Sequence, residues 1–185
     1  MRRYGIYRAI AMTELTIDRI DSEIGMILVV SDGESLCALD FGEYEARMLK
    51  LLQRRYRHFY FRQKKNPLGL SSRIQAYLEG DFNSVDDLPV STGGTPFQQE
   101  VWTALRTIPS GTVVSYGQLA AKLGKPTASR AVGMTNSLNP VAIVLPCHRV
   151  IGATSLTGYA GGLKRKSWLL QHEGVDLTFR LRSKS

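Results

Sequence analysis

"VSYGQLAAKLGKPTASRAVGMTNSL" (residues 114–138) decides how the second half of this chain folds. Ser115 is suited to cap a helix that runs to Leu123, and residues 124–126 then form a short turn that contains glycine. Thr127 is suited to cap a second helix that ends near residue 138. Two short helices joined in this way predict a helix-turn-helix, although such pairs also occur in helical domains that do not bind DNA.

One face of the second helix is sterically small beside a single long cation. Arg130, Gly133, Asn136 and Ser137 all fall on this side. A glycine inside a helix costs about 1 kcal/mol relative to alanine, so Gly133 must serve a purpose. It allows close approach either to a phosphate backbone or to a packed neighbouring helix, and the sequence favours neither.

Upstream of this pair, the chain divides at a small-residue segment. The sequence LPVSTGG (residues 88–94) combines a proline with two adjacent glycines, and it predicts a boundary between residues 1–90 and 91–185. Thr95 follows as an N-cap, Pro96 suits the first helical position and Gln98 completes a capping box. A helix is therefore expected from there to residues 109–111.

The first half alternates strand and helix patterns. Residues 54–65 are basic with interleaved aromatics, which favours a helix end leading into a half-buried strand over a nucleic-acid surface. Strands are expected at 15–20, 26–30 and 36–41, and helices at 44–56 and 70–79. The fold class is therefore α+β: an N-terminal α/β supporting domain with a small antiparallel sheet, and a C-terminal mainly helical domain with the helix-turn-helix.

The charge is distributed unevenly along the 185 residues. The formal net charge is +8, and all of the excess lies in residues 96–185, which hold 11 basic and 3 acidic side chains. Such a field attracts polyanions, although a basic face that only aids solubility has the same composition.

Several function classes are excluded. No apolar run approaches the ~20 residues that span a bilayer, and we expect neither a signal peptide nor a membrane partner, hence a cytoplasmic protein. Residues 1–11 are interpreted as a leader outside the fold. The three histidines and two cysteines show no metal-ligand spacing, so no metal is expected.

The motif LPCHRV surrounds Cys147 with residues that suit a reactive thiol. Pro146 restricts the backbone, His148 could reach the sulfur through one water, and Arg149 adds positive potential that favours the thiolate. Glu173 could orient His148 in the order acid, histidine, nucleophile. The alternative is that Cys147 is a small buried hydrophobe, which is the usual role of a lone cysteine.

At these motifs the sequence resembles a known family. TPFQQEVWTALRTIPSGTVVSYGQLA, SRAVGMTNSLNPVAIVLPCHRV and LTGYAGGLKRKSWLLQHEG follow one another as in the O6-alkylguanine-DNA alkyltransferases, also called methylated-DNA–protein-cysteine methyltransferases. The resemblance covers residues 93–174. The first half agrees in plan and through YLEGDF, which is similar to bacterial members without a zinc-binding N-terminal domain.

The resemblance implies DNA repair by direct alkyl transfer. The protein would bind double-stranded DNA through the minor groove, flip out O6-alkylguanine and take the alkyl group irreversibly, once per molecule. O4-alkylthymine is a second candidate substrate. No cofactor and no obligate protein partner are implied, and a monomer is expected.

The resemblance also assigns roles to residues. Cys147 would accept the alkyl group, His148 would act through a water as base with Glu173 behind it, Tyr116 would donate a proton toward the guanine ring, and Arg130 would replace the flipped nucleotide in the stack. Asn139 would order the recognition helix and the active-site segment. The remaining DNA or substrate contacts would come from the Val150 backbone, Tyr159, Ala160, Gly133 and Ser129.

The chain departs from the family pattern at three places. Ser129 replaces the usual alanine, Leu138 replaces a glycine or serine, and the loop at residues 152–156 is one residue shorter, which bears on the range of alkyl groups accepted.

Three alternative functions remain open. A non-catalytic alkyltransferase-like lesion-recognition protein would lack the cysteine that is present here. An unrelated cysteine hydrolase would leave Arg130 and the basic half unexplained. A plain helix-turn-helix regulator would not need Cys147.

Overall fold

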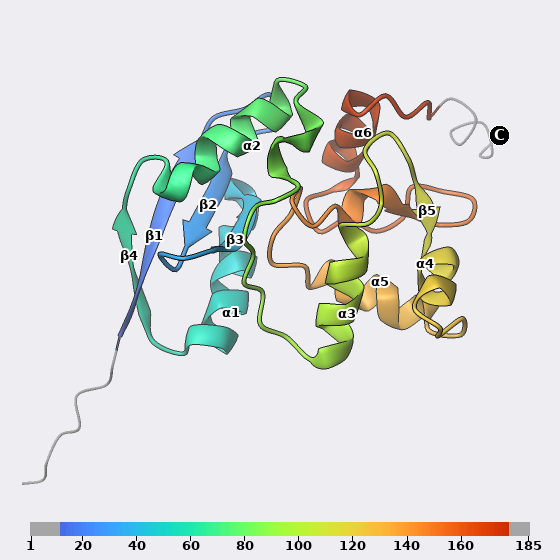
Figure 1. Ribbon diagram of the computed structural model, residues 1–185, viewed down its shortest axis with the longest axis horizontal. Helices are drawn as coiled ribbons and strands as arrows, with labels where there is room; N and C mark the ends of the chain where they lie inside the picture. The colour runs from blue at the N-terminus through green and yellow to red at the C-terminus, as the bar shows by residue number, and fades with distance from the viewer. Residues whose placement is uncertain (1–11, 178–185) are drawn as a thin grey trace, which may run out of the picture.

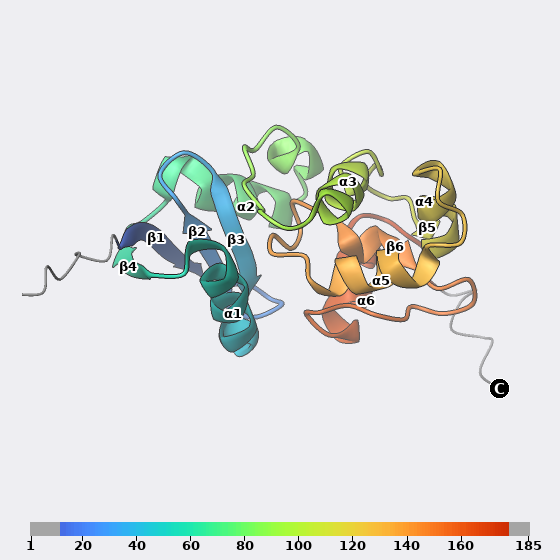
Figure 2. The same cartoon turned by 90° about the horizontal axis from the view of Figure 1, so that it is seen from below.

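The computed structural model describes residues 12–177, so the leader predicted at residues 1–11 lies outside the described part. A four-stranded sheet with two helices forms one side of the molecule, and the remaining helices form the other (Figures 1 and 2). The strands are β1 (Thr13–Ile20), β2 (Ile27–Ser31), β3 (Leu36–Phe41), β4 (Phe59–Gln63), β5 (Val114–Ser115) and β6 (Val150–Ile151). The α-helices are α1 (Glu45–Tyr56), α2 (Leu70–Leu78), α3 (Pro96–Leu105), α4 (Tyr116–Lys122), α5 (Ser129–Ser137) and α6 (Leu163–His172).

The main sheet has the strand order β3-β2-β1-β4 and is mixed. The expected antiparallel pairing holds for β1 with β2 and for β2 with β3, but β4 runs parallel to β1. The prediction missed this pair because turn signals reveal only hairpins between consecutive strands. β4 instead follows α1, which returns the chain to the end of the sheet where β1 begins. As expected, residues 54–65 are a helix end followed by a strand, half-buried at Phe59 and Phe61.

Both faces of the sheet are covered, because alternate side chains of β2 enter two different cores. Leu28 and Val30 pack with Met48 and Leu52 of α1. Ile27 and the other side chains on the opposite face belong to a larger core, to which α2, α3, α5 and α6 all contribute. This larger core joins the two halves of the chain, and the division at residues 90/91 stays a prediction.

The helical half begins where the capping signals predicted. Thr95 and Gln98 form a capping box at α3, and Ser115 forms another with Gln118 at α4. The second helix of the pair differs from its prediction, since α5 begins at Ser129 and Thr127 caps nothing. The residues before α5 are used in a turn in which Lys125 N donates to Ala120 O and Ala128 N to Lys125 O.

The segment that follows α5 is held against the sheet by β3. Leu39 N donates to Pro140 O and Ala142 N donates to Leu39 O, each at 2.9 Å, so this segment adds a short parallel contact to the edge of β3. The neighbouring α1 contributes Arg47, whose guanidinium pairs with Asp40 and donates to the carbonyls of Ser137 and Asn139. The first half thereby fixes the chain immediately before Cys147.

Candidate active site

Cys147 lies in a buried single-turn helix (Cys147–Arg149), and only 4% of its surface is exposed. Asn139 acts on the segment from inside. Its Nδ2 donates to Cys147 Sγ at 3.1 Å and to Leu145 O at 2.8 Å, while its Oδ1 accepts from Val141 N at 2.9 Å. Every polar atom of this amide is therefore engaged, and the amide sets the position of the sulfur.

Burial raises the pKa of the Cys147 thiol above its ordinary value. The hydrogen bond from Asn139 and the positive charges of Lys166 and Arg47 act in the opposite direction without overcoming it. The resting sulfur is therefore a protonated thiol, and the site must supply a base before the thiol can act as a nucleophile.

Arg149 contacts the carboxylate of Glu173 and the backbone carbonyl of Ile108. Its Nη2 lies 2.9 Å from Glu173 Oε1, its Nε lies 3.0 Å from Oε2, and its Nη1 donates to Ile108 O. This buried guanidinium is bound by the carboxylate and by a backbone carbonyl, and its effect on the thiolate stays a prediction. The cations that act on the Cys147 sulfur are Lys166 and Arg47.

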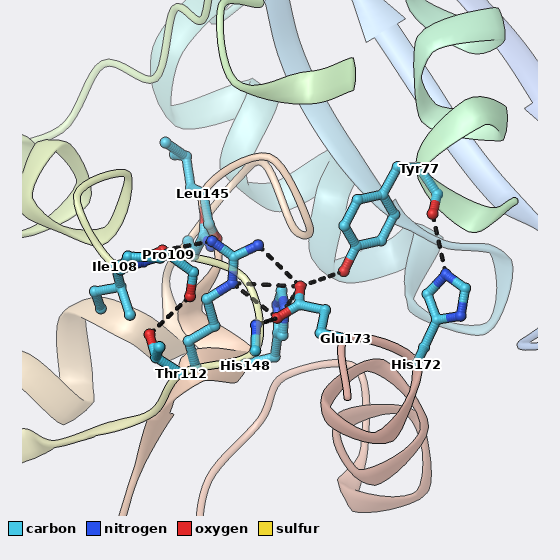
Figure 3. Close-up of polar contacts among 11 residues, drawn as sticks. Tyr77, Ile108, Pro109, Thr112, Leu145, His148, His172 and Glu173 are labelled. Atoms are coloured by element: carbon cyan, nitrogen blue, oxygen red, sulfur yellow. Dashed lines mark hydrogen bonds and ion pairs between the residues drawn. The ribbon is translucent and has the colours of Figure 1, made fainter. Parts of the chain in front are cut away.

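His148 and Glu173 form the pair that the sequence predicted (Figure 3). His148 Nε2 lies 2.8 Å from Glu173 Oε1, and both side chains are fully buried. Burial lowers the pKa of His148 below 6.5 despite the carboxylate, so the imidazole is neutral at rest. A neutral ring that faces a carboxylate donates from Nε2, which leaves Nδ1 as the basic nitrogen. Nδ1 is buried and has no partner among the described residues.

Glu173 stays ionised although it is buried. Burial raises its pKa, but the hydrogen bonds and charges of His148 and Arg149 outweigh this and hold the pKa well below its ordinary value. Tyr77 of α2 donates to Oε1 at 2.6 Å (Figure 3). Gly111 N donates to Oε2 at 3.4 Å. Tyr77 comes from the first half and was not predicted as a site residue, although it begins the YLEGDF motif.

Lys166 is a second residue near the sulfur that was not predicted from the sequence. Its side chain is fully buried, and Nζ donates to Val150 O at 2.6 Å, Gly158 O at 2.9 Å and Thr157 O at 3.0 Å. Burial lowers its pKa to about 8, and the nearby Cys147 sulfur partly counters this effect. Lys166 thus ties the loop before α6 to the cysteine segment. Its position in the basic run KRK concealed this buried role.

A cavity of about 270 Å³ opens over the sulfur. Tyr116 lies on one wall, where burial first and the neighbouring Cys147 second raise its pKa to about 12, and its Oη donates to Thr157 O at 3.1 Å. Five of the predicted site residues meet here together with three others. The lining is Tyr116, Gly133, Asn136, Ser137, Cys147, Gly158, Tyr159 and Ala160.

Gly133 is not required by helix packing. A Cβ there would meet only the Tyr116 ring, at 3.7 Å, which is an ordinary contact. Gly161, by contrast, needs to be glycine, since a Cβ would lie 2.5 Å from the Phe41 ring and 2.7 Å from the Tyr159 ring. The GYAGG motif therefore lets the Tyr159 wall of the cavity pack against β3.

Arg130 and Ser129 lie outside the cavity lining, in the first turn of α5. Arg130 is exposed, and its side chain forms no ion pair or hydrogen bond with any described residue. It lies one helical turn from Gly133 on the same face, so it borders the cavity wall. Loop 152–156 is closed by a hydrogen bond from Gly152 N to Ser155 O at 2.9 Å.

The remaining expectations concern metal ions, membrane-spanning helices and the second cysteine. Within residues 12–177, no group of His, Cys, Asp and Glu side chains is arranged to hold a metal ion. No helix in the same range has the length and apolar character needed to cross a membrane. Cys37 is a core residue between the sheet and α1, and burial raises its pKa to about 12.

Comparisons with known proteins cover nearly the whole chain. The family model "6-O-methylguanine DNA methyltransferase, ribonuclease-like domain" matches residues 6–92, and "6-O-methylguanine DNA methyltransferase, DNA binding domain" matches residues 96–175. The chain is 49% identical over 170 residues to the methylated-DNA–protein-cysteine methyltransferase of Shigella flexneri, over 90% of this chain and 99% of that protein. It is 41% identical over 155 residues to the Methanosarcina acetivorans protein of the same name, over 83% and 95%.

Solved structures agree in fold. The crystal structure of Mycobacterium tuberculosis O6-methylguanine methyltransferase is similar with a TM-score of 0.71 at 38% identity, over 86% of this chain and 92% of that chain. The structure of Mycobacterium tuberculosis OGT in complex with DNA is similar with a TM-score of 0.70 at 37% identity, over the same shares of the two chains.

Proposed function

The chain belongs to the 6-O-methylguanine DNA methyltransferase family, and we propose that Cys147 is the residue on which it receives the alkyl group of O6-alkylguanine. The activity is direct repair, the transfer of an alkyl group from DNA to a protein cysteine. The observation that carries the assignment is the Cys147 sulfur itself, which lines the cavity and accepts a hydrogen bond from Asn139. Cys37 also lines a cavity, of about 280 Å³, but no histidine or glutamate lines that cavity, and its thiol donates to Val30 O.

The His148–Glu173 pair supplies the base that the thiol needs. We place one bridging water between Cys147 Sγ and His148 Nδ1, the nitrogen left without a partner. The thiol proton passes to Nδ1, and Glu173 stabilises the resulting imidazolium through Nε2. Arg149 and Tyr77 keep Glu173 ionised and oriented, so both are positioning residues.

The transfer itself is a displacement at the alkyl carbon. The thiolate sulfur forms a bond to that carbon while the bond from carbon to O6 breaks, and the electron pair of that bond stays on the guanine. The guanine takes up one proton as it leaves. In the net reaction, the proton lost by the thiol is therefore gained by the guanine. The product thioether contains no group that water readily displaces, and each molecule therefore acts once.

Tyr116 donates a hydrogen bond toward the guanine ring as negative charge develops there. The phenol is protonated at neutral pH, since its pKa is about 12, and it therefore has a proton with which to donate. When the base enters, Tyr116 Oη exchanges its bond to Thr157 O for one to the ring. Val150 O accepts from the guanine amine with the lone pair that Lys166 leaves unused, and Tyr159 and Ala160 line the side near O6.

The DNA contact centres on α5. We propose that this helix enters the minor groove of duplex DNA and that Arg130 fills the gap left by the flipped nucleotide. The support is that Arg130 is exposed and unpaired within the described residues, one turn from the cavity. Gly133 and Ser129 add little bulk there, and the +8 charge lies in this half.

The cellular location, the oligomeric state and the second substrate are also proposals. Neither described cysteine forms a disulfide, which suits a reducing compartment, and we place the protein in the cytoplasm. We propose that it works as a monomer without a cofactor or an obligate protein partner. O4-alkylthymine remains a second candidate substrate.

One mass measurement tests the assignment. After incubation with duplex DNA that carries O6-methylguanine, the protein should gain one methyl group, about 14 Da, in a peptide that contains Cys147. Cys147→Ala should gain no mass, whereas the matched variant Cys37→Ala should be methylated like the natural chain. An unmodified Cys147 in a folded protein, or methylation at Cys37, would overturn the proposal.

A further inference from the structure

The cavity over Cys147 contains two buried polar groups that the protein leaves unpaired. Asn136 is 5% exposed, and neither Nδ2 nor Oδ1 of its amide has a partner among the described residues. The hydroxyl of Tyr159 is likewise buried and unpaired. Both residues line the same cavity as the sulfur.

Unpaired buried groups of this kind are costly and rare in folded proteins. The neighbouring Asn139 shows the ordinary situation, since all three of its hydrogen bonds are made within the chain. Asn136 and Tyr159 differ because their polar atoms have no partner among the described residues, although both residues line the cavity over the sulfur. Together they offer amide donors, a carbonyl acceptor and a hydroxyl to whatever enters.

The chemistry of the transfer indicates which part of the substrate meets them. Sulfur attacks the alkyl carbon from the side opposite O6, so the other substituents of that carbon point sideways, toward the walls around the sulfur. Asn136 and Tyr159 both contribute to the walls of the cavity that contains the Cys147 sulfur. A methyl group presents only hydrogens there, whereas a longer substituent reaches the walls.

We propose that Asn136 and Tyr159 form a polar subsite that selects alkyl groups carrying a hydroxyl on the carbon beyond the one transferred, such as 2-hydroxyethyl. This inference rests on the proposed function and adds a substrate preference to it. The hydroxyl would accept from Asn136 Nδ2 or donate to Oδ1, and it would also satisfy the hydroxyl of Tyr159. An apolar group of equal size leaves both residues unpaired, so the transition state for its transfer is less favourable.

The test compares two adducts of equal size. Single-turnover rate constants are measured with duplex DNA carrying O6-(2-hydroxyethyl)guanine or O6-propylguanine, with O6-methylguanine as the reference substrate. The ratio of the hydroxyethyl to the propyl rate constant is unaffected by changes in DNA affinity, thiol activation or folding, because these act on both substrates equally. Asn136→Leu, which keeps the size of the side chain, should lower this ratio about threefold to tenfold. This change corresponds to the net free energy of one hydrogen bond.

Two further variants keep the test decisive. Tyr159→Phe removes only a hydroxyl, should lower the same ratio, and carries the test alone if Asn136→Leu does not fold. Met134→Leu changes an exposed side chain of the same helix that is absent from the cavity lining, so it should leave the ratio unchanged.

The possible failures are distinguishable. An unchanged ratio in the folded Asn136 and Tyr159 variants would overturn the polar subsite, and so would an equal slowing of all adducts, which indicates a contact to the base. Absence of transfer from O6-methylguanine by the natural chain would instead overturn the proposed function.

Discussion

Replacing Glu173 with glutamine removes one negative charge and almost no volume from the centre of the site. The carboxylate is fully buried and receives both arms of Arg149, the ring of His148 and the hydroxyl of Tyr77. Without the charge, the Arg149 guanidinium remains buried and uncompensated. Losing one partner of a buried ion pair costs about 3–5 kcal/mol, and we expect Glu173→Gln to lower the free energy of unfolding at pH 7 by that amount.

The pH dependence gives this prediction its sign. The pKa of Glu173 lies well below its ordinary 4.5, so its contribution to stability is fully present above pH 4.5 and declines as the pH falls below that value. The stability difference between the natural chain and Glu173→Gln should therefore be constant near neutrality and shrink toward about pH 3.5. Urea unfolding at both pH values measures this stability difference. In thermal unfolding, each kcal/mol would appear as a shift of about 2–4 °C in Tm.

Two results would refute the reasoning. A variant as stable as the natural chain at pH 7 would show that the carboxylate is not the partner of a buried cation. A stability difference that persists undiminished in acid would show that Glu173 titrates normally. Glu100→Gln, which changes a surface pair with Lys125, is the matched control and should shift stability by about 1 kcal/mol or less.

Three further predictions concern transfer and stability. The rate of methyl transfer should stay level through neutral pH and fall only below pH 6.5, because burial lowers the pKa of His148 and only the neutral ring accepts the thiol proton; a decline that begins above neutrality would contradict this. Arg130→Ala should slow repair more than it weakens binding to undamaged duplex, and equal repair rates would remove its role in the stack. Tyr77→Phe removes a hydrogen bond to a carboxylate and should cost about 1.5–3 kcal/mol in urea unfolding, whereas an unchanged midpoint would exclude that bond.

The parts of the fold that the sequence predicted depend on local chemistry. The capping boxes at Thr95 and Ser115 involve atoms three residues apart, and both are formed as expected. Strand pairing across the chain is a different matter, since β4 reaches β1 only through the path of α1. Thr127 failed as a cap because a turn used the residues that precede α5, and a propensity does not reveal such competition.

The residues of the candidate site also fall into those that the sequence identified and those that it did not. Cys147, His148 and Glu173 are identifiable because their chemistry is unusual for their neighbourhood. Lys166 lies in the basic run KRK, so nothing in the sequence separates its buried role from a solvated surface. Arg149 was assigned to the nearest reactive group in sequence, whereas the fold brings a carboxylate 24 positions away into contact with it.

The placement of Tyr77 and Arg47 changes what the first half contributes. Tyr77 donates to the carboxylate that orients His148, and Arg47 donates to the Asn139 carbonyl while its charge acts on the Cys147 sulfur. One residue thus acts on the proposed base and the other on the proposed nucleophile, and both come from outside residues 93–174. The net charge of the first half is close to zero, so its contribution to the reaction is local positioning rather than attraction of DNA. The first half, through α1 and α2, therefore contributes side chains to the candidate active site.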